Sequence, residues 1–194
     1  STMNRNLLFG LLALVAVSVF FMLSTEPNGD SETAQTGSAT EASKQSTVGL
    51  ITDERIINLE SEGPGNWLSH GRTYEETRFS PLTQINKETV SQLGLAWYKD
   101  MGTNRAQEST PIIVDDIMYL TSSWSIVYAI DAKTGETLWR YDPEVPGEHA
   151  RKACCDVVNR GVAVYEGMVY VGSLDGRLIA LNAESGDVIW EKDT

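Results

Sequence analysis

Basic residues, histidine and cysteine are scarce in this chain of 194 residues. Lysine and arginine together number 15 against 27 aspartates and glutamates, a formal net charge of -12, so the phosphates of a nucleic acid would be repelled and no nucleic-acid partner is expected. The two histidines, His70 and His149, lack the spacing of metal ligands and are interpreted as ordinary surface or loop residues. A hydrophobic fraction of 41% excludes a disordered acidic tail, because it is enough to form one core.

Long apolar runs are also missing, with one exception at the start of the chain. Residues 7–23 form an uninterrupted apolar run, preceded by Arg5 and followed by Glu26 and Asp30. The run predicts an N-terminal apolar helix within residues 1–24, either a cleaved signal peptide or an uncleaved membrane anchor. Its charged flanks place the following chain outside the cytoplasm, in a bacterial cell in the periplasm, tethered to the inner membrane if the segment is kept.

Aromatic side chains are absent from residues 25–50, and apolar ones are nearly so. Ser, Thr, Ala, Glu and Gly dominate this stretch, a composition typical of a flexible linker. Two interpretations stay open: a tether that holds a domain away from the membrane, or an N-terminal tail with no spacing role.

From residue 51 to residue 194 no stretch sustains the periodicity of a long helix. Short runs of alternating apolar and polar residues are separated by turn residues, which indicates an all-β domain. One short helix is expected at Thr83–Leu93, where helix-forming residues gather.

An internal repeat decides the architecture, because an offset of 51 residues superposes seven identical residues. The pairs are Tyr119 and Tyr170, Ser122 and Ser173, Ala129 and Ala180, Ala132 and Ala183, Gly135 and Gly186, Trp139 and Trp190, and Asp142 and Asp193. Turn residues divide the second copy into four short strands, at 161–165, 168–173, 177–182 and 188–192. Four antiparallel strands per repeat is the blade of a β-propeller.

A glycine and a tryptophan recur near the end of each copy. Gly135 and Gly186 are expected to take the positive φ of a tight turn. Trp139 and Trp190 follow on the next strand, where each ring would lie between neighbouring blades, and Trp97 is expected to do the same from an outer strand of another blade. We interpret these three tryptophans as blade-docking residues.

Propellers close their ring with four to eight blades. The two repeats and the strand with Trp97 make only part of such a ring, so we expect the chain to be the N-terminal part of a longer protein. Residues 51–194 would then be the first part of its propeller.

The only two cysteines, Cys154 and Cys155, are adjacent. Outside the cytoplasm thiols tend to oxidise, but adjacent Cα atoms lie about 3.8 Å apart, closer than in most disulfides. The pair is either a strained disulfide that closes a negligible loop or two reduced side chains on opposite faces of a strand.

Two charged residues stand at comparable places in the two repeats. Glu108 and Arg160 each precede the first strand of a blade, at positions that face the axis of a propeller. A guanidinium there is suited to bind a carboxylate. An ordinary salt bridge at the rim is the alternative.

At these residues the chain resembles a known family, the pyrroloquinoline quinone (PQQ)-dependent alcohol dehydrogenases of the methanol and ethanol dehydrogenase type. The resemblance runs from Asn66 to Thr194, through the stretches NWLSHGRTYEETRFSPLTQIN and CCDVVNRG and the two Trp repeats. The adjacent cysteines followed by DVVNRG are the specific part, because the Trp repeats fit any quinoprotein-like propeller. The resemblance implies an eight-bladed propeller with PQQ bound on its axis.

For this chain the resemblance implies four cofactor-binding residues. Cys154 and Cys155 would form a disulfide ring stacked against the quinone, Arg160 would pair with one of its carboxylates, and Glu108 would be a second polar contact. The family oxidises alcohols with the help of a calcium or lanthanide ion and passes the electrons to a cytochrome c or a quinone. Its metal ligands and catalytic Asp would lie beyond Thr194, so no catalytic or metal-binding residue is assigned.

Other functions predict different features. A non-catalytic propeller with the same Trp repeat, acting as a periplasmic scaffold, would need neither the cysteine pair nor an inward Arg160. A sugar-oxidising membrane quinoprotein usually lacks adjacent cysteines and has several membrane spans. A tethered carbohydrate or peptide receptor stays open as a binding module.

Overall fold

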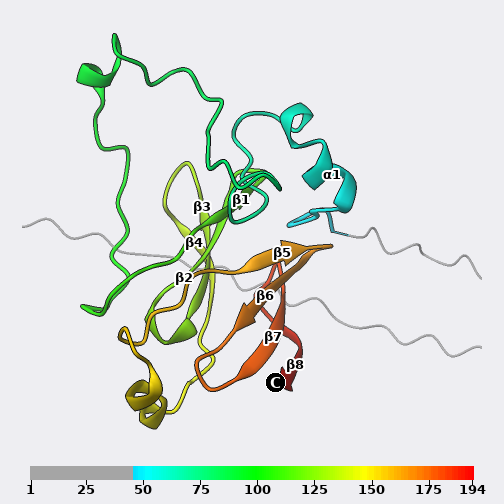
Figure 1. The fold of residues 1–194 in the computed structure, drawn as a ribbon, viewed down its shortest axis with the longest axis vertical. Helices are drawn as coiled ribbons and strands as arrows, with labels where there is room; N and C mark the ends of the chain where they lie inside the picture. Colours follow the sequence, from blue (N-terminus) through cyan, green and yellow to red (C-terminus); the bar gives the residue numbers. More distant parts are fainter. Residues whose placement is uncertain (1–45) are drawn as a thin grey trace, which may run out of the picture. The chain divides into compact units, whose positions relative to one another are not determined.

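The computed structural model describes residues 46–194, so the expected signal peptide or anchor and most of the expected linker lie outside the described residues. Within the described part, no helix is both long and apolar enough to cross a membrane. Its main elements are two four-stranded sheets that follow each other along the chain, drawn from green to yellow and from orange to red in Figure 1.

Each sheet is an antiparallel meander in which consecutive strands pair. The first contains β1 (Ile112–Val114), β2 (Ile117–Thr121), β3 (Val127–Asp131) and β4 (Thr137–Tyr141). The second contains β5 (Ala163–Tyr165), β6 (Met168–Gly172), β7 (Arg177–Asn182) and β8 (Val188–Asp193). The prediction of an all-β chain with four strands per repeat is confirmed, and the strands of the second repeat begin and end within two residues of their predicted limits.

The two sheets repeat in detail as well as in topology. In the first sheet the register of β3 against β4 shifts between Ala129 and Ile130, and in the second that of β7 against β8 shifts between Ala180 and Leu181, 51 residues later. The third strand of each sheet, β3 or β7, is the most buried, because both of its faces are covered. Val127 and Ala129 in β3 and Ile179 and Ala180 in β7 are fully buried. One core cluster includes residues of both sheets, so the two blades share a hydrophobic interface.

The chain before the first sheet packs onto the turns at one end of both sheets. Helix α1 (Asp53–Ile57) is capped by the Thr52 side chain and followed by the 3₁₀ helix η1 (Leu59–Ser61). Arg55 forms a bidentate pair with Asp115 in the β1–β2 turn, at 2.8 and 3.0 Å. Gly49 is buried, with φ +65°, and its carbonyl accepts a hydrogen bond from Gly167 N in the β5–β6 turn. Packed structure therefore begins before residue 50, where the sequence predicted the end of a flexible linker.

The short helix expected at Thr83–Leu93 is reduced to one 3₁₀ turn, η2 (Val90–Gln92). The Asn86 side chain accepts hydrogen bonds from Glu88 N and Thr89 N, and these local bonds replace helical ones. The apolar side chains of the segment, such as Ile85 and Leu93, are exposed. An isolated segment of this length without a packed face does not hold a helix in water, so the expectation was wrong in extent. The remaining 3₁₀ helices are η3 (Ser123–Ser125) and η4 (Gly147–Lys152).

Trp97 and Trp139 have equivalent surroundings. The indole N–H of Trp97 donates to Ala132 O at 3.1 Å, and that of Trp139 donates to Ala183 O at 2.9 Å. The Trp97 ring lies over Gly135, and the Trp139 ring, from the first sheet, lies over Gly186 of the second. A Cβ on either glycine would come within 2.7 Å of the ring, so each glycine leaves room for an indole as well as taking a positive φ.

The outer strand predicted around Trp97 is not formed, since the structure assigns no strand before β1 in the described residues. The segment has no neighbouring strand there with which to make a ladder, yet its tryptophan still packs. Trp190 repeats the position of Trp139 and its tilted contact with a tyrosine, Tyr170, at a centroid distance of 6.0 Å. It is 39% exposed, against 8% for Trp139.

Candidate functional site

The starts of the two innermost strands lie side by side and bring the predicted charges together. Thr110, just before β1, forms a parallel bridge with Gly161, just before β5, and its N–H donates to Arg160 O at 3.1 Å. The Arg160 guanidinium therefore lies beside the Glu108 carboxylate, with Nη2 and Oε2 3.1 Å apart. The Arg160 side chain is 67% exposed, which leaves most of its donors free for a further partner.

The adjacent cysteines lie between η4 and β5, and both are exposed. Their Sγ atoms are 2.8 Å apart and the thiols are free in this structure, so the disulfide stays a prediction. The neighbouring Cys154 thiol raises the pKa of Cys155; Glu108 raises it further, and Arg160 lowers it. Cys154, Cys155 and Arg160 border one cavity and Glu108 pairs with Arg160, so all four predicted cofactor-binding residues lie in one neighbourhood.

A hollow of about 190 Å³ opens between these residues. It is lined by Ala153, Cys154, Cys155, Asp156, Val158, Arg160 and Leu174. Leu174 belongs to the β6–β7 turn, so the second sheet contributes an apolar wall that the sequence did not reveal. The hollow combines two exposed sulfurs, three apolar side chains, one available guanidinium and the Asp156 carboxylate, whose oxygens accept hydrogen bonds from Arg105 and Ala106. This donor set fits a flat molecule that carries carboxylates.

Asn159 connects the start of β5 to three other segments, although no motif singled it out. Its amide N–H groups donate to Ser125 Oγ at 3.1 Å and Gly172 O at 2.8 Å, and its Oδ1 accepts from Gly161 N at 3.0 Å. Its own carbonyl accepts from Thr121 Oγ1. All hydrogen-bonding groups of the side chain are used, which fixes the backbone next to Arg160. Its position directly before Arg160 was the only available signal.

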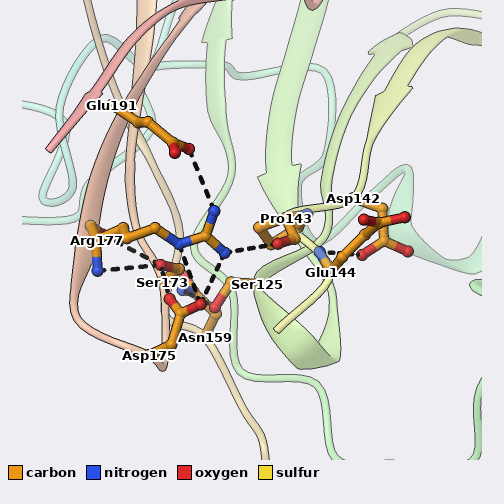
Figure 2. Close-up of polar contacts among 9 residues, drawn as sticks. All are labelled: Ser125, Asp142, Pro143, Glu144, Asn159, Ser173, Asp175, Arg177 and Glu191. Carbon is orange, nitrogen blue, oxygen red and sulfur yellow. Dashed lines mark hydrogen bonds and ion pairs between the residues drawn. The ribbon is translucent and has the colours of Figure 1, made fainter. Parts of the chain in front are cut away.

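An arginine on β7 holds the β6–β7 turn, as Figure 2 shows. Arg177 donates to the Asp175 carboxylate at 2.7 and 3.0 Å and to Pro143 O, in the connection after β4, at 2.6 Å. Its bonds to Asp175 hold the pKa of that carboxyl below its usual range. Ser173 Oγ also donates to Asp175. The network fixes the turn that carries Leu174 against the first sheet.

The sequence assigns no metal ligand to this chain, and it indicates that both histidines are ordinary surface or loop residues. Among residues 46–194, no group of three or more His, Cys, Asp and Glu side chains could hold a metal ion. His70 lies 2.6 Å from Arg78 Nη2, outside the candidate site, and His149 lies within η4.

Comparison with known proteins gives a consistent assignment. Residues 67–191 match the family described as glucose/ethanol/alcohol dehydrogenase, beta-propeller domain, which binds PQQ. The dehydrogenase subunit of the alcohol dehydrogenase (quinone) of Komagataeibacter europaeus is 53% identical over 158 residues, 81% of this chain and 21% of that protein. The 1-butanol dehydrogenase (cytochrome c) of Thauera butanivorans is 54% identical over 130 residues, 67% of this chain and 19% of that protein.

A solved structure agrees with these relatives. The quinohemoprotein alcohol dehydrogenase ADHIIG of Pseudomonas putida HK5 superposes with a TM-score of 0.73 at 50% identity, covering 77% of this chain and 22% of that one. The chain thus spans about a fifth of the length of the curated relatives it matches. The family match, these relatives and the repeated Trp-over-Gly blade contacts lead to one conclusion: the chain belongs to the PQQ-dependent alcohol dehydrogenase family.

Proposed function

We propose that this chain is the N-terminal part of a quinoprotein dehydrogenase that oxidises primary alcohols with PQQ. The observation that carries the proposal is that Arg160 and the two cysteines line one open hollow, while Glu108 pairs with the Arg160 guanidinium. Each of the three features has an ordinary structural explanation by itself. Together they supply an exposed cation, an acid and a pair of sulfurs on one side of a cavity, as recognition of a flat quinone with carboxylates requires.

In this proposal the residues of the chain bind and orient the cofactor and do not carry out the chemistry. The Arg160 guanidinium would donate to a cofactor carboxylate, and Glu108 would hold that guanidinium and offer a second polar contact. Cys154 and Cys155, oxidised to a disulfide, would form the floor against which the ring stacks. When bound, PQQ supplies the acceptor for the hydride that leaves the alcohol.

The remaining components of the proposal lie outside the described residues. A calcium or lanthanide ion would be held by residues beyond Thr194. Electrons would pass to a cytochrome c or a quinone, in keeping with the names of the two relatives. The apolar run at residues 7–23 supports a periplasmic location, with tethering to the inner membrane if the run is not cleaved.

The test uses the complete protein, expressed without cofactor and titrated with PQQ in the presence of calcium or a lanthanide. We expect quenching of tryptophan fluorescence on binding and alcohol-dependent reduction of an artificial dye and of cytochrome c. Arg160→Ala should weaken PQQ binding at least tenfold, because the charge-assisted hydrogen bond to a carboxylate is lost.

Arg140→Ala is the matched control, since Arg140 is also an exposed arginine paired with an acid, Asp142, but lies away from the hollow. Its PQQ affinity should equal that of the unaltered protein. A complete protein that binds no PQQ would overturn the proposal and leave the scaffold function, in which Arg160 and Glu108 are only a surface ion pair. Equal losses in both arginine variants would remove Arg160 from the site.

A further inference from the structure

One carboxylate joins the cysteine segment to the segment that carries Glu108. Asp156 directly follows the cysteine pair, and its Oδ1 accepts a hydrogen bond from Arg105 Nη1 at 2.8 Å. Its Oδ2 accepts from Ala106 N at 3.2 Å. Arg105 and Ala106 stand three and two residues before Glu108, so this acid connects two of the predicted binding elements that are about 50 residues apart in sequence.

The backbone of Asp156 needs support from its surroundings. Its φ is +69°, in the left-handed region that residues other than glycine seldom adopt. A bridge between Cys154 and Asp156 closes the chain tightly around Cys155. A conformation of this kind persists only where neighbouring contacts hold it, and the hydrogen bonds of the Asp156 side chain are such contacts. The Val157 N–H contributes too, and it is the main reason that the pKa of the Asp156 carboxyl lies below its usual range.

A bond from Thr110 shows that the two segments are joined on both sides of Glu108. On one side Asp156 holds Arg105 and Ala106. On the other side Thr110 N donates to Arg160 O. Glu108 therefore sits on a short span whose two ends are both bonded to the Cys154–Arg160 segment. Loss of the Asp156 bonds would free one end of that span and leave the Thr110 end in place.

We propose that Asp156 is a positioning residue of the quinone site, which sets the place of the cysteine pair relative to Glu108 through Arg105 and Ala106. This inference rests on the proposed function, because Asp156 can position a quinone site only if the hollow binds PQQ. Asp156 itself lines the hollow, but both of its carboxylate oxygens accept hydrogen bonds from the 105–106 segment, so it acts through its neighbours. In the proposed function the cofactor contacts come from the cysteines, Arg160 and Glu108. Leu174, in the β6–β7 turn, and Asn159, which donates to Gly172 O in β6, complete the frame of the site.

The experiment measures PQQ affinity of the complete, metal-loaded protein by fluorescence titration, for Asp156→Asn, Arg105→Met and the double variant. Each single variant should bind PQQ about tenfold more weakly, and the double variant should be no weaker than either, because both remove the same contact. Arg105→Lys keeps the positive charge and should recover most of the loss. Urea unfolding midpoints of the same variants, measured without PQQ, should stay close to that of the unaltered protein, because the Arg105 and Asp156 pair is partly exposed.

Asp142→Asn serves as the control, since Asp142 also forms an exposed pair with an arginine at 2.8 Å, away from the hollow. Its PQQ affinity should not change. An Asp156→Asn affinity within twofold of the unaltered protein would overturn the inference, as would losses in the two single variants that simply add. Failure of the unaltered protein to bind PQQ would overturn the proposed function instead, so the two failures are distinguishable.

Discussion

The two ends of the blades differ in how strictly the repeat is kept. Gly135, in the β3–β4 turn, and Gly186, in the β7–β8 turn, are identical 51 residues apart, and both receive a tryptophan ring. At the β2–β3 and β6–β7 turns only the first residue, Ser122 or Ser173, is kept, and Trp124 in the first sheet stands where Asp175 stands in the second. The comparison teaches that the repeated residues dock blades, whereas the residues that break the repeat build the candidate site.

The residues just before β1 and β5 also differ between the two sheets, one serving the fold and the other the candidate site. With an offset of 51, Arg160 corresponds to Ser109 and Gly161 corresponds to Thr110. Ser109 Oγ accepts a hydrogen bond from Thr121 N and so serves its own sheet. Arg160, at the equivalent place, projects its guanidinium toward Glu108 and solvent. One backbone position therefore carries a structural hydroxyl in one blade and a candidate ligand-binding group in the next.

The largest effect is expected from the docking tryptophans. Trp139→Ala should lower the free energy of unfolding by about 3 to 5 kcal/mol, because it removes a buried ring and its hydrogen bond to Ala183 O. In the complete protein Trp190→Ala should cost as much, since a further blade would cover its ring as the second sheet covers Trp139. Thermal unfolding of both variants checks this, and a cost for Trp190→Ala below about 1 kcal/mol would mean that no blade stacks on it.

Alanine variants of two glycines would separate the cost of backbone strain from the cost of a clash with a tryptophan ring. Gly186 and Gly176 both have positive φ, +78° and +94°, so an alanine is strained at either place by about 1 kcal/mol. A Cβ at Gly186 would lie 2.7 Å from the Trp139 ring, whereas at Gly176 it would meet nothing within 4 Å. Gly186→Ala should therefore cost about 2 to 4 kcal/mol and Gly176→Ala only about 1, measured by urea unfolding. Equal costs would show that the indole shifts freely.

Much of this architecture could be predicted from local pattern, and the exceptions have a physical reason. The strands of the second repeat and the paired glycines follow from turn residues and from the 51-residue offset, which are local signals. The helix expected at Thr83–Leu93 failed because helix-forming residues do not suffice without a packed face. Glu108 and Arg160 could be singled out because their charge is unusual at the start of an inner strand, and the structure shows that the two side chains pair. Asp156 and Asn159 were missed because their partners, Ala106 and Gly172 among them, are main-chain groups far away in sequence, which no side-chain pattern records.

The smallest effect is expected from a change at Asp175, in the β6–β7 turn of the second sheet. Asp175 has its pKa lowered by Arg177 and is mostly buried, at 11% exposure, so the pair stabilises the fold above the pKa of the unfolded carboxyl, about 4. The contribution is lost as the pH falls through the lower pKa of the folded state. Asp175→Asn should therefore reduce stability by about 1 to 2 kcal/mol at pH 7, with the difference from the unaltered protein shrinking below pH 4.

Urea unfolding midpoints at pH 7, 5 and 3.5 test the effect of Asp175→Asn, with Asp116→Asn as the control, because Asp116 pairs with Lys133 at an exposed site where little stability is at stake. A difference for Asp175→Asn that stays constant across these pH values would show that the side chain acts through its shape or neutral hydrogen bonds. The same variant sharpens the comparison between the two ends of the blades. Its turn carries Leu174 into the hollow, so a loosened turn should weaken PQQ binding, whereas Gly186→Ala, at the opposite end of the blade, should reduce stability and leave PQQ affinity unchanged.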